Sequence, residues 1–140
     1  PPDLRARIED GLRARVRDRL GFARRAGQAV SGWQAAREWL QAGRAGLIVQ
    51  ASDGSAAERA RLLGLRAVPM VAPLTAADLG AVFGRDRAVH VAVAPGRLAE
   101  GIAAEAARLA GVAAATGVTR GDPDGGETPR TTMGAARRAA

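Results

Sequence analysis

The stretch Leu47-Ile48-Val49-Gln50-Ala51-Ser52-Asp53-Gly54-Ser55 decides the fold class of this 140-residue chain. Its first five residues form a short, largely apolar run, which predicts a buried strand. Small and polar residues follow, so a helix is predicted to begin there with Asp53 or Ser55 as its cap. Glu58 stands three residues after Ser55, in the spacing of a capping box. A buried strand that leads directly into a helix is typical of α/β domains.

Helices and short strands alternate on both sides of this unit. Apolar residues recur every four positions from Leu4 to Leu20 and predict an amphipathic first helix, either continuous or broken at Gly11. The strand 68–71 is predicted to lie at the edge of the sheet, because Pro69 has no N–H group for a central ladder. The pattern predicts further helices over 31–43, 55–64, 75–84 and 96–110, and a further strand over 88–94.

Local signals place the ends of these helices. Ser31, followed by Gln34, is predicted to cap the second helix. Gly43 is predicted to end that helix in a left-handed conformation. Thr75, followed by Asp78, is predicted to cap the fourth helix. With helices on both faces of one small sheet, we expect an α/β fold.

Composition predicts one domain followed by a tail. Hydrophobic residues make up 47% of the chain, which excludes disorder over its whole length. We expect one α/β domain over 1–113, with an N-terminal helical extension, and a disordered tail over 114–140, where Gly, Pro, Thr and charged residues replace periodic apolar ones. No apolar run approaches the ~20 residues of a membrane span, and Pro1-Pro2-Asp3 is no secretory signal. We therefore expect a cytoplasmic protein and, since methionine does not come first, part of a longer chain.

The charge of the chain predicts a polyanionic partner. All 21 basic residues are arginines and 14 residues are acidic, which leaves a net charge of +7. Residues 1–44 hold ten of these arginines and five acids, a net charge of +5. Such an uneven distribution is typical of a binding face, and nucleic acid is the chief partner of basic surfaces.

The residue types of most enzymes and metal sites are missing. The chain has no cysteine and a single histidine, His90, so no metal site and no catalytic residue is predicted. No Gly-rich phosphate loop follows a strand, so no cofactor is predicted either. His90 lies within a predicted strand, where a hydrogen-bonded buried histidine is expected. Residues 52–55 are expected to cap a helix rather than to bind an anion or accept a phosphoryl group. We expect a protein that is not an enzyme.

The strongest local cluster is Gly21-Phe22-Ala23-Arg24-Arg25-Ala26-Gly27. Its two adjacent arginines stand at a predicted helix end before a glycine turn. They either compensate the helix dipole or bind phosphates, and the sequence leaves both interpretations open.

Trp33 and Trp39 follow this cluster on the second predicted helix. Trp33 shares a helix face with Ala36 and Leu40, which favours core packing over base stacking. Trp39 points away from that face, and packing on a neighbouring helix is favoured over stacking on a base.

These motifs occur in the order of one known family. Gly21 to Gly27 and Ser31-Gly32 are followed by Ala42-Gly43-Arg44-Ala45, Leu47 to Asp53, Ala67-Val68-Pro69, Asp78-Leu79-Gly80 and Gly84 to Val93. Residues 12–111 thereby resemble the ribosomal L-seven-Ae/L-thirty-e superfamily, in its bacterial RNA-binding branch. The resemblance implies a three-layer α-β-α sandwich with a small mixed sheet of about four strands. The fourth strand is then expected either in the segment of the first helix or in the turn Gln28-Ala29-Val30, and the turn is favoured because short strands are easily missed from pattern alone.

The resemblance also implies an RNA site at the start of the second helix and in the loop before the last strand. Family members that bind kink-turns carry Gly-x-Asn-Glu-x-x-Lys at that helix start. This chain carries Gly32, Gln34, Ala35 and Glu38 at those positions, so specific kink-turn binding is not expected. The implied RNA-binding residues are Arg24, Arg25, Gly32, Trp33, Gln34, Arg37, Arg44, Arg85 and Arg87.

The sequence thus predicts a non-enzymatic domain that binds structured RNA, either ribosomal, transfer or nascent, and no membrane. Bacterial relatives of this type often follow a small basic YlxR-like domain, which implies a role in ribosome function or in transcription termination or antitermination. One alternative is a protein-interaction module that keeps the fold without specific RNA binding. Another is the accessory domain of an RNA methyltransferase.

Overall fold

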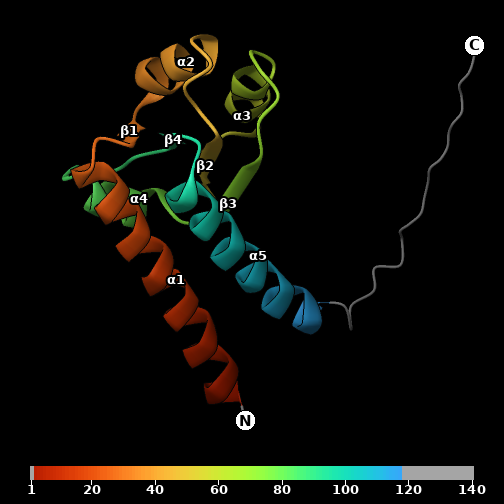
Figure 1. Cartoon of the computed structure of the whole chain (residues 1–140). Helices are drawn as coiled ribbons and strands as arrows, with labels where there is room; N and C mark the ends of the chain where they lie inside the picture. The colour runs from red at the N-terminus through yellow and green to blue at the C-terminus, as the bar shows by residue number, and fades with distance from the viewer. Residues whose placement is uncertain (1, 118–140) are drawn as a thin grey trace, which may run out of the picture.

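Five helices surround a four-stranded sheet in the computed structural model, which describes residues 2–117 (Figure 1). The elements follow one another as α1 (Pro2–Arg25), β1 (Ala29–Ser31), α2 (Trp33–Gln41), β2 (Leu47–Ala51), α3 (Ala56–Leu63), β3 (Met70–Leu74), α4 (Ala76–Val82), β4 (His90–Val93) and α5 (Arg97–Gly117). Residues 114–117, predicted as the start of the tail, belong to α5, and the rest of the predicted tail lies outside the described residues.

The sheet has the strand order β1-β4-β2-β3 and mixes both kinds of pairing. β4 runs antiparallel to β1 and to β2, whereas β2 and β3 are parallel. The short strand β1 lies in the turn where the fourth strand was expected, with Ala29 opposite Val93. β3 is an edge strand, as predicted from Pro69, although it begins at Met70 and not at residue 68. The prediction of a small mixed sheet is confirmed.

Side chains alternate between the two faces of the sheet and build two separate cores. Leu47 and Val49 of β2 point into the core with α1, α4 and α5. Ile48 of β2 and Ala92 of β4 point into the core with α2 and α3. Figure 1 shows these two groups of helices on opposite sides of the sheet. The chain is therefore a three-layer α-β-α sandwich, as the sequence predicts.

Two predicted helix caps are confirmed and one is wrong. The hydroxyl oxygen of Ser55 accepts from the Glu58 amide, and that of Thr75 accepts from the Asp78 amide, each at 3.2 Å. Ser31 caps nothing, because it is the last residue of β1, where it lies opposite Val91. Gly32 stands before α2 instead, and no side chain caps that helix.

Glycine positions explain how the helices end and why α1 is continuous. Gly43 follows α2 with a φ of 72°, the left-handed stop that the sequence predicts. Gly11 does not break α1, which is a single helix through that residue. A glycine costs an exposed helix only about 1 kcal/mol relative to alanine. The packing of the flanking helical turns is therefore enough to keep α1 continuous. α5 likewise continues past Ala110, its expected end.

A buried carboxylate fastens α1 to α5. Glu105 of α5 is 1% exposed and is surrounded by Arg108 at 2.7 Å, Arg19 at 3.3 Å and Arg15 at 3.7 Å. Burial by itself raises the pKa of Glu105, but the hydrogen bond and charge of Arg108, with those of Arg19 and Arg15, outweigh it. The pKa therefore lies below the usual value of a glutamate. A Cβ on Gly101 would stand 2.5 Å from Arg19 Nη1, so a glycine there makes room for this contact.

Candidate nucleic-acid interface

Most arginines in the first twenty residues are paired with acids within the fold. Arg13 pairs with Asp10 and Glu9 on α1 itself, at 3.2 and 3.8 Å. Arg17 lies 4.0 Å from Asp78 of α4, and Arg15 and Arg19 reach Glu105 of α5. The net charge of +5 over residues 1–44 is therefore not one binding face, because much of α1 carries charges that are compensated by its neighbours.

The arginines named as RNA-binding residues behave differently. Within residues 2–117 the structure gives them no salt bridge, so their positive charges are uncompensated by a close acid. All except Arg37 are exposed, and Arg37 is half-buried on α2. These arginines are Arg24, Arg25, Arg37, Arg44, Arg85 and Arg87.

Arg24 holds the end of α1 against the end of α4. Its Nη1 donates a hydrogen bond to the Val82 carbonyl oxygen at 3.0 Å, and its guanidinium lies 6.0 Å from the centre of the Phe83 ring. Its other nitrogen, Nη2, comes within 3.7 Å of the place of a Cβ on Gly84. The end of α1 and the α4–β4 loop thus meet through Arg24. Arg25, one residue on, lies along its own helix near Gly21 and is exposed.

The start of α2 and the loop before β4 lie together, as the resemblance implies. The Gly32 amide donates to the His90 carbonyl oxygen at 2.8 Å. Arg85 of the loop places its Nη1 3.5 Å from where a Cβ on Gly32 would be. Gly32 has a φ of 108°, which L side chains rarely adopt. The α4–β4 loop therefore joins Arg24 and Arg85 to the first residues of α2.

The two tryptophans pack in the core between the sheet and the layer formed by α2 and α3. Trp39 is 8% exposed, and the Arg44 guanidinium covers its ring at 4.5 Å, so the prediction of packing is confirmed. The expectation that Trp39 points away from Ala36 and Leu40 is wrong, because the three residues share one core. Trp33 is half-buried and packs on the same core, also as predicted. The Arg61 guanidinium lies 5.0 Å from the centre of its ring. Trp33 is the tryptophan next to Gly32 and keeps part of its surface open.

The remaining predicted residues lie along and beyond α2. Gln34 donates from Nε2 to Glu38 Oε2 at 3.1 Å, so its amide is occupied within the helix. Arg44 follows the far end of α2, a helix of nine residues that is about 13 Å long at ~1.5 Å per residue, whereas Gly32 stands before its first residue. The structure thus brings Gly32, Trp33 and Arg85 together and sets Arg24 against the neighbouring loop residue Gly84, and it does not bring Arg44 to them.

A buried polar chain beneath the start of α2 escaped the sequence prediction. His90 is 4% exposed and Gln50 is fully buried. Gln50 Nε2 lies 2.9 Å from His90 Nδ1, and His90 Nε2 lies 3.1 Å from Glu58 Oε1. His90 is the hydrogen-bonded buried histidine that the sequence predicts. The one available signal for its partner was a polar residue, Gln50, inside an apolar strand.

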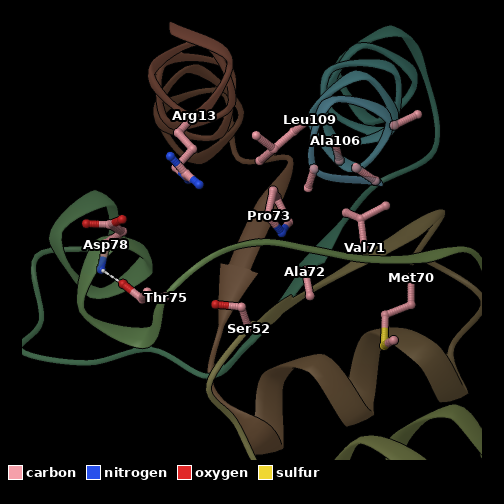
Figure 2. Close-up of a pocket in the computed structure, with 13 residues that line it drawn as sticks. Arg13, Ser52, Met70, Val71, Ala72, Pro73, Thr75, Asp78, Ala106 and Leu109 are labelled. Carbon is pink, nitrogen blue, oxygen red and sulfur yellow. Dashed lines mark hydrogen bonds between the residues drawn. The ribbon is translucent and has the colours of Figure 1, made fainter. Parts of the chain in front are cut away.

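A groove of about 640 Å³ lies elsewhere, between α1, α5 and the edge strand β3 (Figure 2). Val71 and Pro73 of β3 and Ala106 and Leu109 of α5 line it from two sides. Its polar lining comes from Arg13, Ser52, Thr75 and Asp78. None of the predicted RNA-binding residues lines this groove, so it is separate from the interface at the start of α2.

Comparisons with known proteins identify the fold. No family model matches the chain, and no curated protein matches it. Among solved structures, a protein of unknown function from Bacillus halodurans C is 24% identical, with a TM-score of 0.60 over 66% of this chain and 96% of that one. The 15.5kD RNA binding protein of Giardia lamblia is 15% identical, with a TM-score of 0.56 over 73% of this chain and 90% of that one. At these identities the likeness is one of fold, and it agrees with the three-layer sandwich that the sequence resemblance implies.

A membrane span is absent from the described helices. None of those within residues 2–117 combines the length and the apolar composition that crossing a bilayer requires.

Proposed function

We propose that this chain is a non-enzymatic RNA-binding domain of the bacterial branch of the ribosomal L-seven-Ae/L-thirty-e superfamily. It binds structured RNA at the edge formed by the end of α1, the start of α2 and the α4–β4 loop. The proposal is supported by the order of the sequence motifs, by the shared fold with the Giardia RNA binding protein, and by the geometry of that edge.

The observation that carries the proposal is the meeting of Arg85 with the first turn of α2 at Gly32. No side chain caps this helix start and no acid stands in its first turn, so its amide groups and its dipole favour an anion. Arg85 beside it has no acidic partner within the described residues, and the Arg24 side chain of α1 lies against Gly84 of the same loop. Amides and guanidinium groups that converge in this way suit the phosphates of a nucleic acid.

The proposed RNA is not a kink-turn. The Gln34 amide is bonded to Glu38, Ala35 offers no acceptor for a base edge, and Glu38 places a negative charge where relatives carry lysine. We propose instead that the domain recognises phosphate positions on ribosomal, transfer or nascent RNA. Its place in ribosome function or in transcription termination, in the cytoplasm and beside a YlxR-like domain, follows from the resemblance.

Charge reversal on and off the proposed edge tests this function. Arg85→Glu is expected to lower the affinity for structured RNA at least tenfold, because it removes one phosphate contact and adds repulsion. Arg97→Glu is the matched control: Arg97 is exposed, belongs to α5 and lies beyond the opposite end of β4, so the affinity should change less than twofold. Fluorescence anisotropy with labelled RNA hairpins measures the affinities of both variants and of the wild type. Equal losses in the two variants contradict the placement of the interface, and no binding by the wild type favours a protein-interaction module.

A further inference from the structure

The chain Gln50–His90–Glu58 links three elements beneath the start of α2. Gln50 belongs to β2, His90 to β4 and Glu58 to α3. Its two hydrogen bonds measure 2.9 Å, from Gln50 Nε2 to His90 Nδ1, and 3.1 Å, from His90 Nε2 to Glu58 Oε1. The ring is buried, whereas the side chain of Glu58 is 48% exposed. A buried histidine is therefore connected to solvent through a single carboxylate.

With the Gln50 amide oriented as it is, one ring nitrogen of His90 accepts a hydrogen bond and the other donates one. An amide nitrogen can only donate, so Nδ1 of His90 accepts the hydrogen bond from Gln50. In the neutral ring the proton is then on Nε2, which donates to the Glu58 carboxylate. A cationic ring would need an acceptor at Nδ1 as well.

The side-chain oxygen of Gln50 can supply that acceptor. Its Oε1 is buried and has no hydrogen-bond partner within the described part of the chain. A half-turn of the side-chain amide exchanges Oε1 with Nε2 and places the oxygen against Nδ1. The ring is then cationic and donates on both sides, to Gln50 Oε1 and to Glu58, and the second bond is charge-assisted. Gln50 and Glu58 thus offer hydrogen-bond partners to the neutral ring and, after the amide rotates, to the protonated ring.

His90 also touches the RNA-contacting end of α2. Its carbonyl oxygen accepts from the Gly32 amide at 2.8 Å. Its ring meets Trp33 edge to face, with centroids 5.2 Å apart and planes at 68°. The backbone and the ring of His90 thus contact Gly32 and Trp33, the two residues at the start of the proposed RNA site.

Among the described residues the charged group in contact with this ring is the Glu58 carboxylate, and further charged groups lie on α3 and on the loop before β4. α3 contributes the Glu58 carboxylate, the partly buried Arg59 and Arg61 over the Trp33 ring. The loop before β4 contributes Arg85, which lies beside Gly32. The side chains that contact the ring from β2 and α2, Gln50 and Trp33, are uncharged. Proton uptake would cancel the negative charge of Glu58 locally and leave these arginines to attract phosphates.

We propose that His90 is a positioning residue for the start of α2 and that protonation of its ring, with rotation of the Gln50 amide, strengthens RNA binding as the pH falls. This inference rests on the proposed RNA-binding function. One added positive charge corresponds to about one phosphate contact, and we expect a two- to tenfold gain in affinity.

The test combines an NMR titration with RNA binding. His90 is the single histidine of the chain, so its ring nitrogens give unambiguous signals. At pH 8 these should show the proton on Nε2, and acidification to pH 5.5 should add the second proton. Over the same range a labelled RNA hairpin should bind the wild type more tightly, whereas His90→Gln, checked for folding by circular dichroism, should bind with nearly constant affinity.

A second variant keeps the inference testable if His90→Gln does not fold. Glu58→Gln changes a half-exposed side chain and leaves the cap intact, because Ser55 is bonded to the Glu58 amide of the backbone. It removes the charge that stabilises the cationic ring and should reduce the gain in affinity at low pH. A proton on Nδ1 at pH 8, or the same pH profile in wild type and variants, overturns the inference while the proposed function stands. Absence of RNA binding at every pH overturns both.

Discussion

Gly32 and Arg85 are distant in the sequence and adjacent in the fold: Arg85 Nη1 lies 3.5 Å from the position of a Cβ on Gly32. The first belongs to the turn between β1 and α2, the second to the loop before β4. β4 holds the first in place, because its first residue, His90, accepts the Gly32 amide, whereas the Arg85 amide donates to the Gly80 carbonyl oxygen of α4. The proposed RNA site therefore depends on backbone geometry as much as on charge.

Replacing Gly32 by alanine should reduce stability through backbone strain. With φ 108° and ψ 153°, Gly32 occupies a region that is nearly restricted to glycine, and a side chain there costs about 1–3 kcal/mol. Gly11→Ala is the control with the opposite sign. Gly11 lies within α1 with nothing near its missing Cβ, so alanine should raise the free energy of unfolding by about 0.5–1 kcal/mol. Urea unfolding of both variants measures the difference, and a neutral Gly32→Ala would contradict the left-handed backbone at this position.

Substitutions of Arg24 and of Arg25 should differ in their effect on stability, although the two arginines are adjacent in the sequence and were predicted to act together. Arg25→Glu should weaken RNA binding across RNA sequences without loss of stability, since its charge is exposed and unpaired among residues 2–117. Arg24→Glu should weaken binding too, and it should also lower the free energy of unfolding by about 0.5–1.5 kcal/mol, because the bond to the Val82 carbonyl is lost. Normal RNA binding by both folded variants would leave these arginines with a structural role alone.

Glu105→Gln should weaken the attachment of α1 to α5, and the resulting loss of stability should depend on pH. Because the folded-state pKa of Glu105 lies below its unfolded value, its charge stabilises the fold above the unfolded pKa of about 4.3. That contribution disappears as the pH falls through the lower, folded pKa. At pH 7 the variant should lose about 1–3 kcal/mol, and its difference from wild type should shrink below pH 4. Glu100→Gln, an exposed glutamate on the same helix, should change stability by less than about 0.5 kcal/mol. An equal effect of the two changes at pH 7 would refute this role.

The α2 positions should control selectivity for kink-turns. The triple change Gln34→Asn, Ala35→Glu and Glu38→Lys restores the pattern of kink-turn binders and removes the Gln34–Glu38 hydrogen bond. Each contact of this kind contributes roughly 1–3 kcal/mol, and neighbouring contacts do not simply add. The variant should therefore prefer a kink-turn over an unrelated hairpin by at least tenfold, whereas the wild type should not discriminate. Competition binding with both RNAs decides, and selective binding by the wild type would show that the motif is aligned wrongly.

The layers of the fold could be predicted because their signals are local. The apolar run Leu47–Ala51, the caps at Ser55 and Thr75 and the stop at Gly43 each act within a few residues. The cap predicted at Ser31 failed because pairing with β4 takes that residue into a strand, and strand pairing is not a local property. The resemblance, not the pattern of apolar residues, located the three-residue strand β1.

The candidate site was predicted less completely, because charge compensation acts between distant elements. Ten arginines in residues 1–44 suggested one basic face, yet Glu105 and Asp78, far along the chain, pair with Arg15, Arg19 and Arg17. The hydrogen-bonded chain through His90 likewise joins three elements, and the sequence around each of its residues carries almost no signal of it. By contrast, the convergence of Gly32 with Arg85 was implied by the family resemblance and is confirmed by the fold.

The salt dependence of RNA binding tests the central claim most directly. If the edge with Arg24, Arg25 and Arg85 neutralises about three to four phosphates, log affinity against log salt should fall with a slope of about −3. Between 50 and 200 mM salt the affinity of the wild type should then drop on the order of 10²-fold. Arg85→Glu should reduce the slope by about 1, while Arg97→Glu should leave it unchanged. A flat response, or no RNA binding at 50 mM salt, would contradict the assignment of this edge as an RNA-binding surface.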